Sequence, residues 1–163
     1  MAKSRDPEHE LLDPNEWQSW GAVMMLNRVV LHELDTELRR EHRLAINEFD
    51  VLITLYNAPD KRLGMTALAE RVLLSPPGTT HLVTRLERDN LVRREVDPTD
   101  RRRSFAVLTA DGDATLRRAR LTHNAVLRRT ILAVASPSER RTLLRLWQRL
   151  AKEHPSPITP AAD

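Results

Sequence analysis

The 163-residue sequence contains no cysteine, which excludes disulfides, thiolate nucleophiles, thiol redox switches and Cys-based zinc sites. No segment approaches the roughly 18 consecutive apolar residues of a membrane-spanning helix, and the charged N-terminus lacks an apolar signal segment. The length suits one compact domain. We therefore expect a single-domain cytoplasmic protein with no membrane partner.

Motifs of catalysis and metal binding are also missing. The sequence has no Gly-rich phosphate loop, no G-x-S-x-G, no H-E-x-x-H and no pair of acids at an identifiable catalytic spacing. His32 and His42 are not at the spacing of metal ligands on a helix, and His123 stands alone. We expect no enzymatic activity, no metal and no cofactor.

The charge that is present is distributed unevenly. Residues 1–60 carry 12 acidic and 6 basic side chains, residues 61–110 carry 6 and 10, and residues 111–163 carry 5 and 10. Nearly all the bases are arginine, which suits bidentate contacts with phosphate or guanine, although a high-GC genome also enriches arginine. The acidic front and the basic back of the chain should attract each other.

Apolar residues spaced alternately three and four apart predict a long first helix over residues 15–40. The repeat resembles a coiled-coil seam with one polar position. Its members are Trp17, Trp20, Met24, Asn27, Leu31, Leu34 and Leu38. Aromatic residues at this spacing either line a ligand pocket or pack against other helices, and we favour packing, partly against another chain.

The middle of the chain predicts three shorter helices. Asn47 is the expected N-cap of the first. The second covers residues 65–72, and the third begins after Ser75 as N-cap, with Pro76 at its first position. Because a short link joins the second helix to the third, the two are expected to form a helix-turn-helix.

The apolar period then changes to that of a β-hairpin. "LVRREV" and "RSFAVLT" predict strands, and "DPTD" predicts a turn with Asp97 at a corner. Two more helices follow, the first starting at Thr109 and reaching Ala133, the second starting at a capping box of Ser136 and Glu139. A hairpin directly after a helix-turn-helix is a wing, which can reach the narrow, negative minor groove of DNA.

Two motifs and the order of elements resemble the multiple-antibiotic-resistance regulator (MarR) family of winged-helix transcription factors. "DRRRSFAVLT" is similar to the wing signature of the family, with Asp100 and Arg102 on its characteristic Asp and Arg. "LAERVLLSPPGTTHLVTRLERDNLVRR" resembles its helix-turn-helix, with Asn90 where the family usually has glycine. Both residues tolerate a positive φ, so the geometry is kept.

The resemblance implies a mostly α fold with a small β-hairpin wing, a winged helix-turn-helix with N- and C-terminal dimerisation helices. The expected parts are a flexible N-terminus (1–14), a dimerisation helix (15–46), a winged helix-turn-helix lobe (47–109), C-terminal dimerisation helices (110–153) and a disordered tail (154–163). The residues expected at the dimer interface are Trp17, Trp20, Met24, Leu143, Leu146, Trp147 and Leu150.

The resemblance also implies a homodimeric repressor that binds a pseudo-palindromic operator in double-stranded DNA and responds to a small phenolic or anionic ligand. Asp100 is expected to hold Arg102 or another wing arginine in place, Arg102 to enter the minor groove, and Arg101 and Arg103 to lie near phosphates. The expected DNA contacts of the recognition helix are Ser75, Pro77, Gly78, Thr79, Thr80, His81, Thr84 and Arg85.

Simpler interpretations exist for several of these residues. An arginine triplet in a turn is often a solvated loop, and Arg85 can pair with Asp89 one helical turn further on. Arg88, Arg93 and Arg94 can touch phosphate or only keep the surface soluble. The alternative function is a winged-helix protein–protein interaction module without sequence-specific DNA binding, in which the wing arginines meet an acidic partner.

Overall fold

A computed structural model describes residues 11–100 and 103–154 of the chain. The predicted flexible N-terminus and disordered tail fall mostly outside these residues. The elements are α1 (Pro14–His42), α2 (Ile46–Tyr56), the 3₁₀ turn η2 (Pro59–Lys61), β1 (Arg62–Gly64), α3 (Met65–Arg71), α4 (Pro76–Arg88), β2 (Val92–Val96), β3 (Ser104–Leu108), α5 (Ala110–Arg129), α6 (Ile131–Val134) and α7 (Pro137–Glu153). Within the described part, no helix is both long and apolar enough to span a bilayer.

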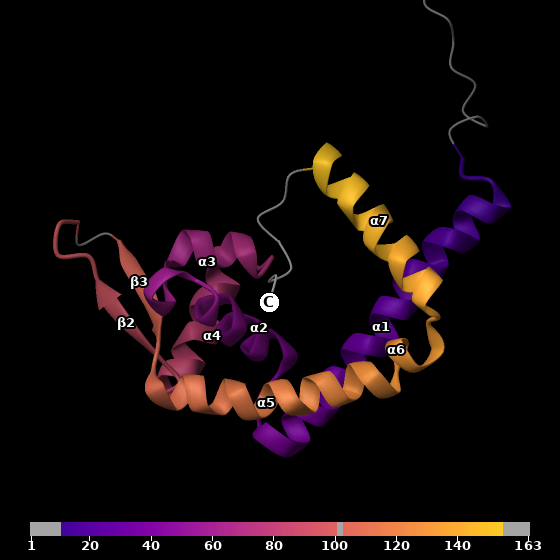
Figure 1. Cartoon of the computed structure of the whole chain (residues 1–163). Coiled ribbons are helices and arrows are strands. Elements are labelled where there is room, and N and C mark those ends of the chain that lie inside the picture. The colour runs from indigo at the N-terminus through magenta and orange to yellow at the C-terminus, as the bar shows by residue number, and fades with distance from the viewer. Residues whose placement is uncertain (1–10, 101–102, 155–163) are drawn as a thin grey trace, which may run out of the picture.

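The molecule consists of a compact lobe and a pair of helical arms (Figure 1). The lobe holds α2, α3, α4 and the strands, while α1 and α7 form the arms, and α5 runs from one to the other. The central helix of the lobe is α2, whose Val51, Leu52 and Leu55 are fully buried. Burial of such a side chain contributes about 1.5–3 kcal/mol, so the lobe has a core of its own.

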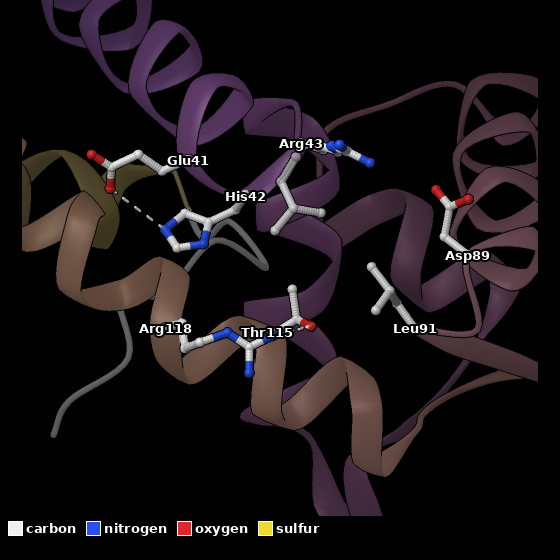
Figure 2. Close-up of a pocket in the computed structure, with 8 residues that line it drawn as sticks. Glu41, His42, Arg43, Asp89, Leu91, Thr115 and Arg118 are labelled. Carbon is white, nitrogen blue, oxygen red and sulfur yellow. Dashed lines mark hydrogen bonds and ion pairs between the residues drawn. The ribbon is translucent and has the colours of Figure 1, made fainter.

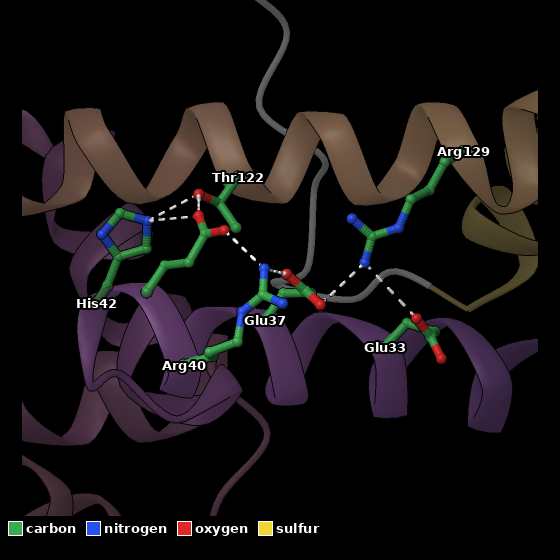
Figure 3. A network of polar contacts seen from close by, with 7 residues as sticks. Glu33, Glu37, Arg40, His42, Thr122 and Arg129 are labelled. Atoms are coloured by element: carbon green, nitrogen blue, oxygen red, sulfur yellow. Dashed lines mark hydrogen bonds and ion pairs between the residues drawn. The ribbon is translucent and has the colours of Figure 1, made fainter.

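The first helix is capped as a capping box, because the Asp13 side chain accepts from Asn15 and Glu16 while Glu16 accepts from the Asp13 backbone. Its C-terminal half, which contains the buried Leu34 and Leu38, lies along α5 and is joined to it by polar contacts (Figure 3). The contacts include ion pairs of Arg129 with Glu37 at 3.3 Å and Glu33 at 3.7 Å, and hydrogen bonds of Thr122 with Glu41 at 2.6 Å and His42 at 2.8 Å. They attach the arm to the helix that leaves the lobe.

The predicted hairpin is present as β2 and β3, but a third strand joins it. β1 pairs antiparallel with β3, with Leu63 opposite Ala106, so the strand order of the sheet is β1-β3-β2. β1 was not predicted, because three residues are too short to show an alternating pattern.

Two predicted boundaries were wrong. The N-cap of α2 is Ala45 and not Asn47, and the carboxylate of Glu48 accepts the Ala45 N–H at 2.8 Å, doing what an Ala side chain cannot. The helix that starts after Thr109 ends at Arg129, and the short α6 contains Ala133, which is exposed. The predicted N-caps Ser75, Thr109 and Ser136 are confirmed, because each side chain accepts a backbone N–H of the first turn of its helix.

The start of α5 is held tightly against the end of the helix-turn-helix. Asn90 has the predicted positive φ of 58°, and its carbonyl accepts the Thr109 hydroxyl at 2.7 Å. A side chain on Gly112 would place its Cβ 2.0 Å from the Leu91 carbonyl oxygen. Glycine therefore permits the close approach of α5 to the root of the wing.

Candidate nucleic-acid interface

The helix-turn-helix is formed by α3 and α4. The Ser75 hydroxyl caps α4 by accepting the Gly78 N–H at 3.2 Å, and Pro76 occupies the first turn. Val83 and Leu86 are fully buried and fix the inner face of the helix. The opposite face is therefore turned away from the core of the lobe.

The outer face of α4 carries small polar groups. Thr80, His81 and Thr84 are exposed, as are Ser75 and Pro77 at the start of the helix, and Gly78 is half-buried. Thr79 was expected on this face, but the expectation was wrong because Thr79 is fully buried and its hydroxyl donates to the Ser75 carbonyl at 3.2 Å. Its position one turn before Val83 puts it on the core side.

Arg85 has a partner that the sequence did not suggest. Its guanidinium lies 3.0 Å from a carboxylate oxygen of Glu48 on α2, and Glu48 is only 2% exposed. The alternative pairing of Arg85 with Asp89 is not the one formed, and Arg88 lies 3.6 Å from Asp89 instead. Arg85 is thus tied to the core of the lobe, which weakens its assignment as a DNA contact.

Arg94 on β2 is also tied to α4. Its guanidinium donates to the Thr80 carbonyl at 2.9 Å and the Thr84 hydroxyl at 2.8 Å, and lies 3.1 Å from Glu87. Arg93, on the other face of the strand, pairs with Glu95 at 2.6 Å. The sequence could not separate these two arginines, but the structure does.

The described part of the wing turn is held by its backbone and by Asp97. The Asp97 N–H donates to the Arg103 carbonyl at 3.0 Å, and the Arg103 N–H donates to the Asp100 carbonyl at 2.9 Å. Hydrogen bonds from the hydroxyl and N–H of Thr99 lower the pKa of the Asp97 carboxyl, in agreement with the turn role predicted for it. Arg103 is exposed, while Arg101 and Arg102 lie outside the described residues, as does the expected contact of Asp100 with Arg102.

A pocket of about 420 Å³ lies where the end of α1 meets α5 and the α4–β2 link (Figure 2). The cationic Arg43 and Arg118 share it with His42 and with the acids Glu41 and Asp89, so it is polar and mixed in charge. Its full lining is Glu41, His42, Arg43, Leu44, Asp89, Leu91, Thr115 and Arg118. Among the described residues, no group of three or more His, Asp or Glu side chains is placed to hold a metal ion.

The arms leave apolar side chains uncovered. Trp17 is 65% exposed and Leu146 is 54% exposed, and α7 has no buried residue along its described length. The other exposed members of the predicted dimer interface are Trp20, Met24, Leu143 and Leu150, while Trp147 is half-buried. An apolar surface of this kind typically marks an interaction site.

Comparisons with known proteins agree with this architecture. Residues 44–104 match the sequence model of the MarR family. The HTH-type transcriptional regulator MhqR of Bacillus subtilis (strain 168) is 38% identical over 72 residues, which are 44% of this chain and 48%, about half, of that regulator.

Two solved structures are similar over most of their length. AbsC, a MarR family transcriptional regulator from Streptomyces coelicolor, is 31% identical with a TM-score of 0.79, over 88% of this chain and 96% of AbsC. Sco3205, a MarR family transcriptional regulator from the same organism solved in complex with DNA, is 27% identical with a TM-score of 0.81, over 93% and 92%. The predicted winged-helix fold is thereby confirmed.

Proposed function

Since this chain belongs to the MarR family of transcriptional regulators, which are not enzymes, we propose that it is a homodimeric repressor that binds a pseudo-palindromic operator in double-stranded DNA. The observation that carries the proposal is the outer face of α4, where exposed Thr80, His81 and Thr84 lie beside the β2–β3 wing. A helix of this kind fits the major groove, and the adjoining hairpin reaches the minor groove.

The proposed contacts follow the same geometry. His81 meets base edges or phosphate, and Thr80 and Thr84 meet phosphate oxygens or thymine methyl groups. Ser75, Pro77 and Gly78 bring the start of α4 to the DNA. In the wing, Arg102 enters the minor groove, Arg101 and Arg103 lie near phosphates, and Asp100 orients an arginine.

The proposed dimer is formed by the arms. The single chain leaves apolar side chains of both arms exposed or, for Trp147, half-buried, and in the dimer those of one protomer would cover those of the other: Trp17, Trp20, Met24, Leu143, Leu146, Trp147 and Leu150. The acidic α1 and the arginine-rich α7 also carry opposite charges. Interlocked arms would fix the distance between two recognition helices.

The proposed regulation is a shift between two spacings of those helices. A small phenolic or anionic ligand that binds better to a dimer with the wrong spacing would shift the population off the operator. The pocket between α1, α5 and the α4–β2 link is a suitable place, because it lies between arm and lobe and offers Arg43 and Arg118 to an anion (Figure 2).

Selection of bound sequences from a random DNA pool tests the proposal. We expect a pseudo-palindrome with half-sites about 10 bp apart, and an affinity that falls steeply with salt. Recovery of no preferred sequence would contradict the proposal and favour the interaction-module alternative. Titration of the bound complex with hydroxybenzoates tests the ligand separately, since release without loss of folding is expected.

A further inference from the structure

The side chain of Arg94 is directed toward the recognition helix and not toward solvent. Arg94 lies in the middle of β2, which is the edge strand of the sheet nearest α4. Because side chains alternate along a strand, Arg94 shares a face with Val92, which is buried, while Arg93 and Glu95 lie on the other face. The Arg94 side chain is 31% exposed, compared with 59% for Arg93.

Its contacts extend over two turns of α4. One guanidinium nitrogen donates to both the Thr80 carbonyl at 2.9 Å and the Thr84 hydroxyl at 2.8 Å. Nε lies 3.1 Å from the Glu87 carboxylate, as an ion pair without the geometry of a hydrogen bond. The other oxygen of Glu87 accepts the backbone N–H of Arg94 at 3.0 Å. Residues 80, 84 and 87 form one stripe of a helix, so the side chain and backbone of Arg94 hold this stripe against β2.

We propose that Arg94 is a positioning residue that fixes the recognition helix relative to the wing, so that the two DNA-reading elements move as one body. This inference rests on the proposed function. The planar fork of arginine can serve several acceptors at fixed angles, whereas the lysine ammonium is a point charge on a flexible stem. The required property is therefore the shape of the guanidinium as well as its charge.

The same contacts restrict Thr84, which lies on the proposed DNA-facing surface. A threonine hydroxyl has a single hydrogen, and that of Thr84 is donated to the Thr80 carbonyl at 2.9 Å while the oxygen accepts from Arg94. Thr84 is thus held in one orientation with its donor occupied. This favours an apolar contact of its methyl group with a base over donation to a phosphate.

The first test is Arg94→Lys, which keeps the charge and removes the fork. We expect roughly ten-fold weaker binding to the selected operator, comparable with the loss of one good base contact, and unchanged binding to random-sequence duplex with the same salt dependence. Arg117→Lys is the matched control, because Arg117 is an exposed arginine on α5 that pairs with Asp113. The control should bind like the wild type.

The second test is Glu87→Gln, for which two explanations predict opposite signs. Removal of an acid near DNA should strengthen binding to any duplex if electrostatics alone matters. The positioning role predicts weaker binding to the operator together with equal or stronger binding to random duplex. Melting temperatures of all variants, measured without DNA, separate this change in specificity from a loss of fold.

The outcomes that overturn the proposal are distinct. Wild-type operator affinity in both variants would remove the positioning role, and operator and random affinities that fall in parallel would indicate a general structural role. A third variant, Arg94→Gln, removes the charge as well. Wild-type operator affinity in Arg94→Lys together with a weaker salt dependence of binding in Arg94→Gln would indicate that Arg94 contacts a phosphate, since loss of one such contact lowers the slope by about one. A wild-type protein that selects no sequence would instead overturn the proposed function itself.

Discussion

Arg85 of the recognition helix and Glu48 of α2 form an ion pair at 3.0 Å in which Glu48 is 2% exposed. An unpaired charge at that depth costs folding free energy, because the carboxylate has lost its water. We expect Arg85→Ala to lower the free energy of unfolding by about 1–3 kcal/mol, measured by urea denaturation without DNA. Such a loss would show that Arg85 stabilises the fold in the absence of DNA.

Arg88→Ala is the comparison for Arg85→Ala. Arg88 is on the same helix, 73% exposed, and 3.6 Å from Asp89. Exposed pairs of this kind contribute about 0–1 kcal/mol, so its loss should change stability little. Equal destabilisation by the two substitutions would show that the buried pair has no special weight.

Asp50 of α2 makes stability depend on pH, because burial raises the pKa of its carboxyl to about 6 from an ordinary 3.8. The folded state holds this proton more tightly than the unfolded state. The contribution of Asp50 to the free energy of unfolding is therefore fully present at low pH and is lost as pH rises through about 6. Asp50→Asn should therefore raise the free energy of unfolding at pH 7, by at most about 3 kcal/mol, and change it little at pH 4.

Asp113 provides a control of opposite sign. A hydrogen bond from Arg117 and another from Lys61 lower the pKa of its carboxyl, so its stabilisation is present above the ordinary pKa and disappears in acid. Asp113→Asn should therefore lower the free energy of unfolding at pH 7 and leave it unchanged at low pH. Parallel pH profiles for the two variants, obtained by thermal unfolding, would contradict the assignment of Asp50.

Local patterns in the sequence were sufficient for the order of helices and for their caps. Ser75, Thr109 and Ser136 each accept the backbone N–H groups that their positions predict, since capping depends on residues three apart. Asn47 was predicted as the N-cap of α2, but the N-cap is Ala45, whose side chain has no acceptor. The acceptor comes from Glu48, a possibility that polarity at a single position does not reveal.

The parts of the candidate interface that were missed depend on contacts between distant residues. Arg85 meets Glu48 across 37 positions of sequence, and β1 is a strand only through its pairing with β3. Arg93 and Arg94 are both arginines, and they differ in the face of β2 on which they lie. Arg93 pairs with Glu95 on one face, whereas Arg94 contacts α4 from the other face. Thr79 was assigned by its polarity, although its helical phase places it with Val83.

Leu73, in the link between α3 and α4, has a left-handed φ of 53° and is 68% exposed. An L side chain is disfavoured there by about 1–2 kcal/mol, and exposure means that packing does not offset the cost. Glycine has no such penalty but loses more entropy on folding, so we expect Leu73→Gly to stabilise the protein by up to about 1 kcal/mol. Thermal unfolding of the variant checks this.

Asn90 is the internal comparison for Leu73. It has a similar φ of 58°, but its side chain donates to Asp111 at 2.7 Å. Asn90→Gly would relieve the backbone strain but would also remove that hydrogen bond, so we expect the variant to be no more stable than the wild type. A stabilised Asn90→Gly beside an unchanged Leu73→Gly would reverse the expected order and show that side-chain contacts do not decide the effect.

Leu146 on α7 tests the arms as a dimer interface. It is 54% exposed in the single chain and lies on the apolar stripe of an amphipathic helix that has no buried residue along its described length. A carboxylate placed there would be desolvated in a dimer but hydrated in a monomer. Leu146→Glu should therefore shift the protein toward monomer in sedimentation equilibrium and leave the lobe folded. Gln148→Glu adds the same charge to an exposed polar position of α7 and should stay dimeric. If Leu146→Glu is also a dimer at the same concentration, α7 does not form the interface, and the spacing of the recognition helices must be set by other surfaces.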